Sequence, residues 1–380
     1  MDLSRTNKLY SLRWLPAYSW QRMVRRSRRN EVTHLIFALA DHFEPAFLPE
    51  NPTRFAPLDV QEQRLEKWCR DYPRAFDAWR DFAGFPFVHT YFYPAEQYEQ
   101  TLVERLAAHC HAGWGEIGIQ LHHGLDVPDT AENTRRQLIQ FRDSLARLGC
   151  LPCVPGDQQP RYGFVHGNWA LANSGRGRYC GVDEEMQILA ETGCYADFTL
   201  PSAPDLAQVA KINALYECAV PLDLRSPHRR GRDLRVSVPP KTFPLIIQGP
   251  LMLDFERRTL GGLFPHIENS ALTGVNPPSL HRLQLWIKAS ITVQGRPDWL
   301  FIKLHCHGMD PRDESAMLGE AILQFLEKLT GWARESQAVL HFMTAREMVN
   351  VALAACDGRE GNPSDFRNFR FRLNESSVRT

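Results

Sequence analysis

Short apolar runs recur along the chain and alternate with amphipathic segments. Seven of these runs have the length and continuity of buried strands, and they lie at 33–41, 85–93, 116–123, 161–168, 194–201, 243–250 and 300–307. A further run at 338–344 is a candidate for an eighth strand. Near-continuous hydrophobic strands are typical of a parallel sheet that is covered on both faces.

Helical periodicity separates several of these runs. In the segment 129–149, the apolar positions recur every three or four residues, at Leu138, Phe141, Leu145 and Leu148. Pro128 precedes this segment as a start signal, and Gly149 ends it. A similar pattern over 314–330 is expected to end at Gly331, and another follows Pro94. Strand and helix thus alternate seven or eight times, which predicts a β/α barrel or a doubly wound sheet.

The alternation is interrupted twice, at about 203–242 and 253–280. We interpret residues 31–356 as a single barrel domain that carries these two stretches as insertions, the first passing over the barrel mouth. Residues 1–30 are expected to form a basic N-terminal arm and residues 357–380 a C-terminal tail. Arginines gather in the arm, at Arg22, Arg25, Arg26, Arg28 and Arg29, and again between 225 and 235.

Composition narrows the classes of function. Lys+Arg and Asp+Glu are both 44, so there is no global field that would attract nucleic acid. Nine cysteines at no framework spacing favour a reducing compartment, and no apolar run approaches the ~20 residues that span a bilayer. We therefore expect a cytoplasmic protein, with peripheral contact to an anionic membrane surface through the arginine-rich segments as a further possibility.

Polar residues follow the ends of the predicted strands, where chemistry collects in parallel α/β folds. They are Asp41, His42 and Glu44 after the first strand, His122 and His123 after the third, His166, Asn168 and Trp169 after the fourth, and His305 and His307 after the seventh. An acid and several imidazoles brought together by the fold would suit a divalent metal such as zinc, which polarises a carbonyl and lowers the pKa of water. The pattern predicts a metal-dependent hydrolase.

The adjacent pair His122 and His123 needs separate treatment. Neighbours in a strand point to opposite faces, so both rings can face the barrel centre only if the strand has already ended. We favour His122 as the inward residue because it shares parity with Gly118 and Gln120.

The order of the motifs "ALADHFEP", "EIGIQLHH" and "IKLHCHG" resembles the polysaccharide deacetylases of the NodB-homology type, within the glycoside hydrolase/deacetylase superfamily. The resemblance covers roughly residues 33 to 350. It implies a distorted seven- or eight-stranded (β/α) barrel and the removal of acetyl groups from a saccharide with the help of a divalent metal. It also implies Asp41 as base and metal ligand, His305 as general acid and His307 as a second candidate for that role.

The chain departs from the family pattern at several of these positions. Gln120 and Gly124 stand where the family has two histidines, so an altered ligand set of Asp41 and His122, with His42 or His123, is expected. Glu44 is the nearest replacement carboxylate. His166 and Asn168 match the family's substrate-binding loop without its arginine. With the saccharide that the resemblance implies, Trp169 is a candidate to stack on a sugar ring.

Two other functions remain open from the sequence. A glycoside hydrolase would need two carboxyl groups, and Asp41 or Glu44 with Asp197 is the pair available. A barrel that binds saccharide without hydrolysing it, and that scaffolds a larger assembly, would explain the altered motifs equally well.

Overall fold

The computed structural model describes residues 11–25, 34–51, 54–259 and 262–373. Its strands are β1 (His34–His42), β2 (His89–Pro94), β3 (Gly115–Leu121), β4 (Tyr162–His166), β5 (Cys194–Asp197), β6 (Leu215–Cys218), β7 (Gly231–Asp233), β8 (Leu245–Ile247), β9 (Met252–Thr259), β10 (Phe264–Glu268), β11 (Ala271–Leu272), β12 (Trp299–Cys306) and β13 (Val339–Met343). Its α-helices are α2 (Leu15–Val24), α3 (Leu58–Phe76), α4 (Gln100–His109), α5 (Ala131–Arg147), α6 (Glu185–Thr192), α7 (Leu280–Ala289), α8 (Glu314–Met317), α9 (Glu320–Glu335) and α10 (Ala345–Cys356). Short helical turns occur at η2 (Ala95–Gln97), η3 (Cys110–Trp114), η4 (Leu171–Asn173), η5 (Pro227–Arg229) and η6 (Pro363–Phe366).

A single mostly parallel sheet of 11 strands forms the centre of the protein. Its order is β11-β12-β1-β2-β3-β4-β5-β8-β6-β7, and β13 also pairs with β1. All eight apolar runs of the sequence contribute strands to this sheet, and the pairs between them are parallel. The prediction of a large α/β fold with a parallel sheet is therefore confirmed.

The sheet is strongly curved. Gly249 follows β8, and a Cβ atom on it would lie only 2.3 Å from the carbonyl oxygen of Lys303 in β12. The Lys303 ammonium also donates to the carbonyl oxygens of Phe198 and Leu200, at 2.7 and 2.8 Å, just beyond β5. Two strands that are far apart in the sheet order therefore approach each other across its concave side, although no ladder between them is recorded in the described part of the chain.

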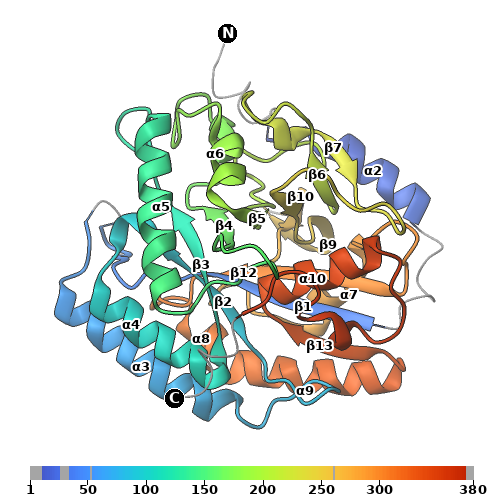
Figure 1. The fold of residues 1–380 in the computed structure, drawn as a ribbon. Helices are drawn as coiled ribbons and strands as arrows, with labels where there is room; N and C mark the ends of the chain where they lie inside the picture. Colours follow the sequence, from blue (N-terminus) through green and yellow to red (C-terminus); the bar gives the residue numbers. More distant parts are fainter. Residues whose placement is uncertain (1–10, 26–33, 52–53, 260–261, 374–380) are drawn as a thin grey trace.

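Alternation along the strands divides the core into two layers. On β1, Leu35, Phe37 and Leu39 belong to one cluster of buried side chains, whereas Ile36 and Ala38 belong to the other. The first cluster packs under α3, α4, α5, α6 and α9, which surround the strands in Figure 1. We call this convex side the outer face. The concave inner face packs against α10, whose side chains are almost all buried.

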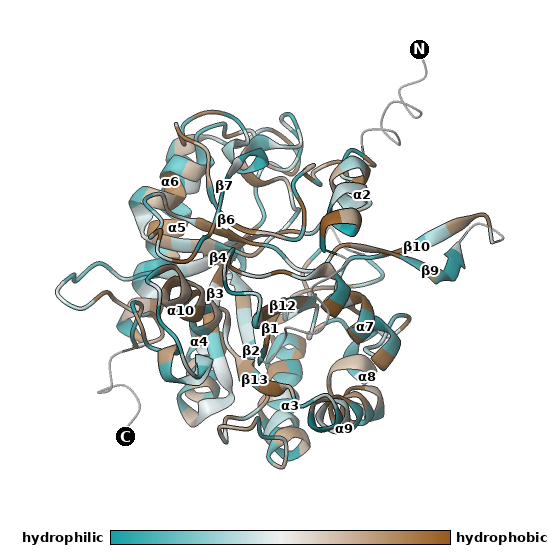
Figure 2. Ribbon diagram, turned by 90° about the vertical axis from the view of Figure 1, so that its right-hand side faces the viewer, coloured by the Kyte–Doolittle hydropathy of each residue, from teal (hydrophilic) through white to brown (hydrophobic). Residues whose placement is uncertain are grey.

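Several segments differ from the sequence expectation. The stretch 203–242 was expected as a loop over the barrel mouth, but β6 and β7 within it extend the sheet as antiparallel strands. The stretch 253–280 contains an antiparallel ribbon, β9–β10, that projects from the body in Figure 2. The helix expected to end at Gly331 continues to Glu335, because a face that includes Ala333 stays buried past the glycine.

Both ends of the described chain pack onto the domain. Helix α2 of the arm lies against the first insertion: Trp14 is fully buried, and Gln21 donates to the Ile212 carbonyl at 2.7 Å. Near the other end, the Asn350 side chain on α10 donates to the carbonyls of Arg367 and Phe371. The described residues do not include residues 1–10 of the expected arm or residues 374–380 of the expected tail.

Candidate functional site

Buried imidazoles, carboxylates and thiols gather where the parallel strands end. Three groups each bring potential ligand atoms within 4.8 Å of one another, and each could hold a metal ion. They are His42 with Glu44 and His307, then His123 with His166, Cys180 and Glu185, and finally Asp41 with His89 and Cys306. We call the first the open cluster, because His307 is partly exposed, and the second the closed cluster, because all four of its members are buried.

The open cluster lies at the carboxyl edge of the inner face. The rings of His42 and His307 have centroids 4.8 Å apart, and His305 lies 6.2 Å from His42. Backbone pairing explains this proximity, since β1 and β12 are parallel neighbours and Ala40 is in register with His305. Glu44 follows two residues after the end of β1 and is only 8% exposed.

Burial favours the neutral form of two imidazoles at this edge, those of His42 and His305. Burial lowers the pKa of His42 well below its ordinary value, and the neighbouring His307, His305 and His122 lower it further. Burial likewise lowers the pKa of His305, and Lys303 adds to that shift. The Nδ1 atoms of His42 and His305 are buried without a hydrogen-bond partner. A neutral imidazole with an unused nitrogen lone pair is the form that binds a metal or accepts a proton.

His122 differs from its neighbours because two carboxylates surround it. Its Nδ1 lies 2.6 Å from a carboxylate oxygen of Glu96, and its Nε2 lies 3.4 Å from Glu44. Although burial alone would lower the pKa of His122, hydrogen bonds to Glu44 and Glu96 raise it to about 10. The Gln120 amide donates to Glu44 and lies 3.2 Å from His122 Nε2, so both residues share the inner face. His122 therefore stands beside the open cluster as a cation.

Close packing fixes the ring of His122 in this position. Gly167 follows β4, and a Cβ atom there would lie 2.3 to 2.6 Å from three ring atoms of His122. The glycine of the "FVHGN" segment is thus required for the imidazole to reach Glu96 and Glu44.

The structure places Asp41 on the outer face, away from the open cluster. Its carboxylate accepts from His89 Nδ1 at 2.9 Å and from the backbone N–H of Gly308 at 2.7 Å. Asp41 and His89 are fully buried and lie under the aromatic rings of α3, including Trp68. The expected ligand set that joined Asp41 to His122 and His42 is not brought together, because alternation turns Asp41 and His42 to opposite sides of β1.

His123 also lies on the outer face, in the closed cluster. Its Nε2 is 3.2 Å from His166 Nε2 and 3.0 Å from a carboxylate oxygen of Glu185. His166, expected to bind substrate, is fully buried in this cluster. Burial alone would raise the pKa of Glu185, but the imidazoles of His166 and His123 lower it to about 2.

The remaining expected site residues lie near these clusters. Asn168 and Trp169 follow His166 and are half-buried, and the Asn168 Oδ1 and Trp169 Nε1 atoms have no hydrogen-bond partner. Trp169 also has a positive φ of 59°, which is uncommon for a residue with a side chain. Burial raises the pKa of Asp197 to about 7 and lowers that of Lys303 to about 7.

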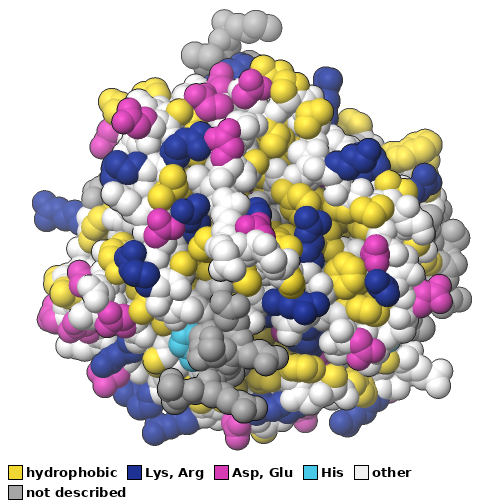
Figure 3. Space-filling view, in the orientation of Figure 1, with side chains coloured by type: hydrophobic (Ala, Val, Ile, Leu, Met, Phe, Trp, Pro, Cys, Tyr) yellow, Lys and Arg dark blue, Asp and Glu magenta, His cyan; other side chains and the backbone are white. Residues whose placement is uncertain are grey.

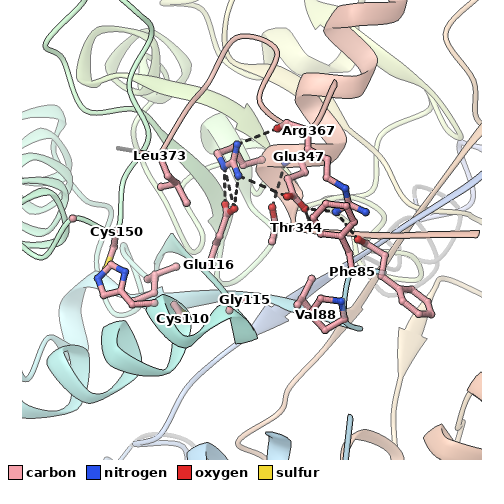
Figure 4. A pocket seen from close by; sticks show the side chains of 17 residues that line it. Phe85, Val88, Cys110, Gly115, Glu116, Cys150, Thr344, Glu347, Arg367 and Leu373 are labelled. Atoms are coloured by element: carbon pink, nitrogen blue, oxygen red, sulfur yellow. Dashed lines mark hydrogen bonds and ion pairs between the residues drawn. The ribbon is translucent and has the colours of Figure 1, made fainter. Parts of the chain in front are cut away.

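A cavity of about 220 Å³ lies at the opposite, amino end of the strands (Figure 4). Its charged groups neutralise one another: Arg346 donates to both carboxylate oxygens of Glu116, and Arg367 pairs with Glu347 and Asp81. This network ties α10 to β3 and to the C-terminal segment. We assign it to stability, because its carboxylates and guanidinium groups already serve one another.

Charge on the molecular surface is mixed. On the face that Figure 3 shows, Lys and Arg side chains are interspersed with Asp and Glu. In the arginine-rich segment 225–235, Arg232 pairs with Glu217, and Arg229 donates to the Ser174 carbonyl. Arg25 donates to the carbonyls of Asn213 and Ala289, whereas Arg26, Arg28 and Arg29 lie outside the described residues. Among the described residues, no helix has the length and apolar character needed to cross a bilayer.

Five residues in or beside these clusters are not among those that the sequence predicts. His89 begins β2, Cys306 is the last residue of β12, Cys180 lies in a loop and Glu185 begins α6, so none of these four comes after the end of a strand. Glu96 does come after one, because η2 directly follows β2, and the pattern of polar residues at strand ends could have indicated it. The alternation along a strand that separates His122 from His123 also separates Asp41 from His42.

Comparison with known proteins adds no family assignment. No protein-family description matches the chain, and no curated protein shows significant similarity to it.

Proposed function

We propose that the protein is a metal-dependent hydrolase that removes acetyl groups from a saccharide, with the open cluster as its metal centre. One observation carries the proposal: His42, Glu44 and His307 bring two imidazoles and a carboxylate within 4.8 Å at the carboxyl edge of a parallel sheet. Three such ligands with a partly exposed member are the usual composition of a catalytic zinc site, which keeps a position for water or substrate. The finer description of the curved sheet as a deacetylase-like barrel belongs to the same proposal.

The residues present fit a divalent cation. Burial keeps His42 neutral, and its buried Nδ1 has no hydrogen-bond partner. Glu44 supplies one negative charge, since His122 keeps its pKa low in spite of burial. A divalent cation at this position would act as a Lewis acid on an acyl carbonyl and would make a water molecule more acidic.

The side chains around the cluster supply the proton transfers in this proposal. His305 lies beside His42 with its Nδ1 free of partners, and as a neutral imidazole it would accept a proton from the attacking water. His122, held as an imidazolium by Glu96, would donate to the departing amine or alkoxide. Asp41, the base expected from the resemblance, has no role here, because its carboxylate is used by His89 and Gly308.

Acetate release from saccharides tests the proposal. The full chain, supplied with Zn²⁺, would be incubated with an N-acetylated chitin oligosaccharide and with an O-acetylated xylan oligosaccharide. Acetate is expected without new reducing ends, and His307→Ala and Glu44→Gln should lower the rate at least a hundredfold. His266→Ala, on the β9–β10 ribbon, is the control that should keep the wild-type rate.

Two results would contradict the proposal. Equal acetate release by wild type and His307→Ala would remove the open cluster from the reaction. New reducing ends without acetate would instead indicate cleavage of a glycosidic bond.

Peripheral contact with an anionic membrane stays a prediction.

A further inference from the structure

The closed cluster is built from four side chains that three separate segments deliver to one point. His123 follows β3, and His166 is the last residue of the neighbouring parallel strand β4, where Leu121 is in register with His166. Cys180 comes from the loop before α6, and Glu185 is the first residue of that helix. The exposed fractions are 4% for His123 and 0% for the other three. No water-facing ligand position is therefore left among them.

The donor atoms converge at distances that suit a common cation. His123 Nε2 lies 3.2 Å from His166 Nε2 and 3.0 Å from Glu185 Oε1, and His166 Nε2 lies 3.9 Å from the same oxygen. Two nitrogens bound tetrahedrally at the usual zinc distances lie about 3.3 Å apart. Cys180 Sγ is within 4.8 Å of the other ligand atoms.

Protons alone satisfy this arrangement poorly. A proton on His123 Nε2 can be donated to Glu185 or shared with His166, but it cannot make a full hydrogen bond to both. One cation at the centre contacts all of the donor atoms at once. Two neutral imidazoles, one thiolate and one carboxylate carry a total charge of −2, which a divalent ion neutralises in a site that water does not reach.

A second layer of contacts orients the imidazole of His123. Its Nδ1 lies 2.9 Å from Asp129 Oδ2, and that carboxylate also accepts from the Thr134 hydroxyl at 2.9 Å and from the Asn133 amide at 2.7 Å. A carboxylate that holds Nδ1–H leaves Nε2 as the ligand atom, and this carboxylate–histidine–metal arrangement is general in zinc sites. The backbone N–H of Asn168 donates to His166 Nδ1 at 3.3 Å. If His166 binds the ion through Nε2, its ring proton moves to Nδ1 and this long hydrogen bond is lost.

Glycines allow the two loops to meet at the cluster. Gly124 has φ +62°, and a Cβ atom on it would lie 2.1 Å from the Cys180 carbonyl oxygen. Gly181 has φ +99°, and a Cβ atom on it would lie 2.5 Å from the Cβ of Pro128. The backbone N–H of Asp129 donates to the Cys180 carbonyl at 2.7 Å. The backbone is thus shaped to carry Cys180 to the two histidines.

We propose that the closed cluster binds one zinc ion as a structural site, distinct from the open cluster on the inner face. Mixed nitrogen, sulfur and oxygen ligands select zinc over magnesium or calcium, and four protein ligands in a dry site define a structural rather than a catalytic centre. The ion fastens the loop after β3 to the loop before α6 and to α6 itself.

Metal content and X-ray absorption of the wild-type chain give the first test. After purification in zinc and dialysis against a mild chelator, one zinc per chain is expected to remain. Its absorption fine structure should show one sulfur at about 2.3 Å and three nitrogen or oxygen neighbours at about 2.0–2.1 Å. A retained zinc with no sulfur neighbour, or no retained zinc, would overturn the proposal. This measurement needs no variant that must fold.

Cobalt substitution identifies the cysteine. Reconstitution of the metal-free chain with Co²⁺ should give a thiolate-to-cobalt charge-transfer band, and Cys180→Ser should abolish it. Cys306→Ser is the matched control, because Cys306 is equally buried and belongs to the group that includes Asp41 and His89. Loss of the band in Cys306→Ser alone, or in neither variant, would place the metal elsewhere and overturn the proposal.

The test is independent of the proposed catalysis. His307→Ala should keep the retained zinc and the cobalt band, whatever its activity. Stripping the retained zinc from wild type with a strong chelator should lower the Tm by about 10 °C or more. An unchanged Tm after the zinc has left would mean that the ion has no structural role.

Discussion

The open cluster lies at the ends of β1 and β12 and the closed cluster at the ends of β3 and β4, on opposite faces of the same sheet. The open cluster has three potential ligands, one of them partly exposed, and faces the concave side. The closed cluster has four buried ligands and a further carboxylate, Asp129, behind His123. Three ligands with access to solvent suit a centre that exchanges water and substrate, whereas four ligands without access suit a permanent ion.

The difference teaches how a parallel sheet can carry two kinds of polar site at the same edge. Side chains that point inward meet across the concavity, where the curvature leaves room. Side chains that point outward meet the helices, and there each polar atom must be matched because water is excluded. The proposed catalysis therefore concerns the inner face and the proposed structural zinc the outer face, and the two proposals can be tested separately.

The largest expected effect comes from forcing the loops of the closed cluster apart. Gly124→Ala would place a Cβ atom 2.1 Å from the Cys180 carbonyl oxygen and would also strain a positive φ. The free energy of unfolding should fall by about 3 kcal/mol or more, and the retained zinc should be lost. Urea denaturation and metal analysis check this prediction.

The matched control for that variant is Gly84→Ala. Gly84 also has a positive φ, of 87°, but nothing lies within 4 Å of the position of its added Cβ. Only the backbone strain of about 1 kcal/mol is expected there, with the zinc retained. Equal losses in the two variants would mean that the contact with Cys180 is unimportant.

A smaller effect is expected from Glu96→Gln at the inner face. The amide keeps a hydrogen-bonding oxygen near His122 but removes the negative charge, so the pKa of His122 should fall from about 10 toward its ordinary value. Acetate release should fall about tenfold to a hundredfold, while the zinc of the closed cluster stays in place.

Titration of the His122 ring signals by NMR checks the pKa, and kinetics on the acetylated saccharide checks the rate. Because the raised pKa of His122 stabilises the folded chain below that pKa, its fall should also lower the free energy of unfolding at pH 7, by about 1–3 kcal/mol. Loss of the retained zinc in Glu96→Gln would show that the two clusters cannot be treated separately.

The smallest effect concerns buried histidines outside both clusters. Burial lowers the pKa of His109 to about 4, and burial lowers the pKa of His228 and His341 to about 3. Between about pH 6.5 and 4 the unfolded chain therefore binds more protons than the folded chain, so stability is complete above pH 6.5 and falls on acidification. Each histidine should contribute about 1 kcal/mol per pH unit in this window.

Urea denaturation at pH 7, 6 and 5 checks this prediction, with His109→Gln as the variant that removes one share of the slope. Any further loss of stability on acidification that comes from the two clusters must be measured as a difference from this dependence of stability on pH. A stability that is independent of pH over this range would contradict it.

The sequence predicts the strands of this fold well because their signal is local. Each of the eight apolar runs is long enough to be buried, and each became a strand of the same sheet. The first insertion was missed as sheet because β6 and β7 have only four and three residues. The extension of α9 past Gly331 was missed because packing of the flanking face outweighed the glycine.

The candidate sites were predictable only in part. Strand ends correctly indicated where polar side chains gather, and alternation places His122 beside Gln120. Cys180 and Glu185 could not be found in this way, because a loop and a helix bring them to His123 over about 60 residues of chain. The resemblance implies Asp41 as a metal ligand, whereas the structure turns Asp41 toward His89 and its neighbour His42 toward Glu44 and His307.

The consecutive positions of His122 and His123 have a consequence for the tolerance of β3 to length changes. Insertion or deletion of one residue within β3 would rotate everything after it by half a pleat and exchange the destinations of the two rings. Such a change would remove the His122 imidazole from the open cluster's side and the His123 imidazole from the closed cluster in a single step. The segment from Gly115 to Gly124 should therefore tolerate substitutions far better than it tolerates a change in length.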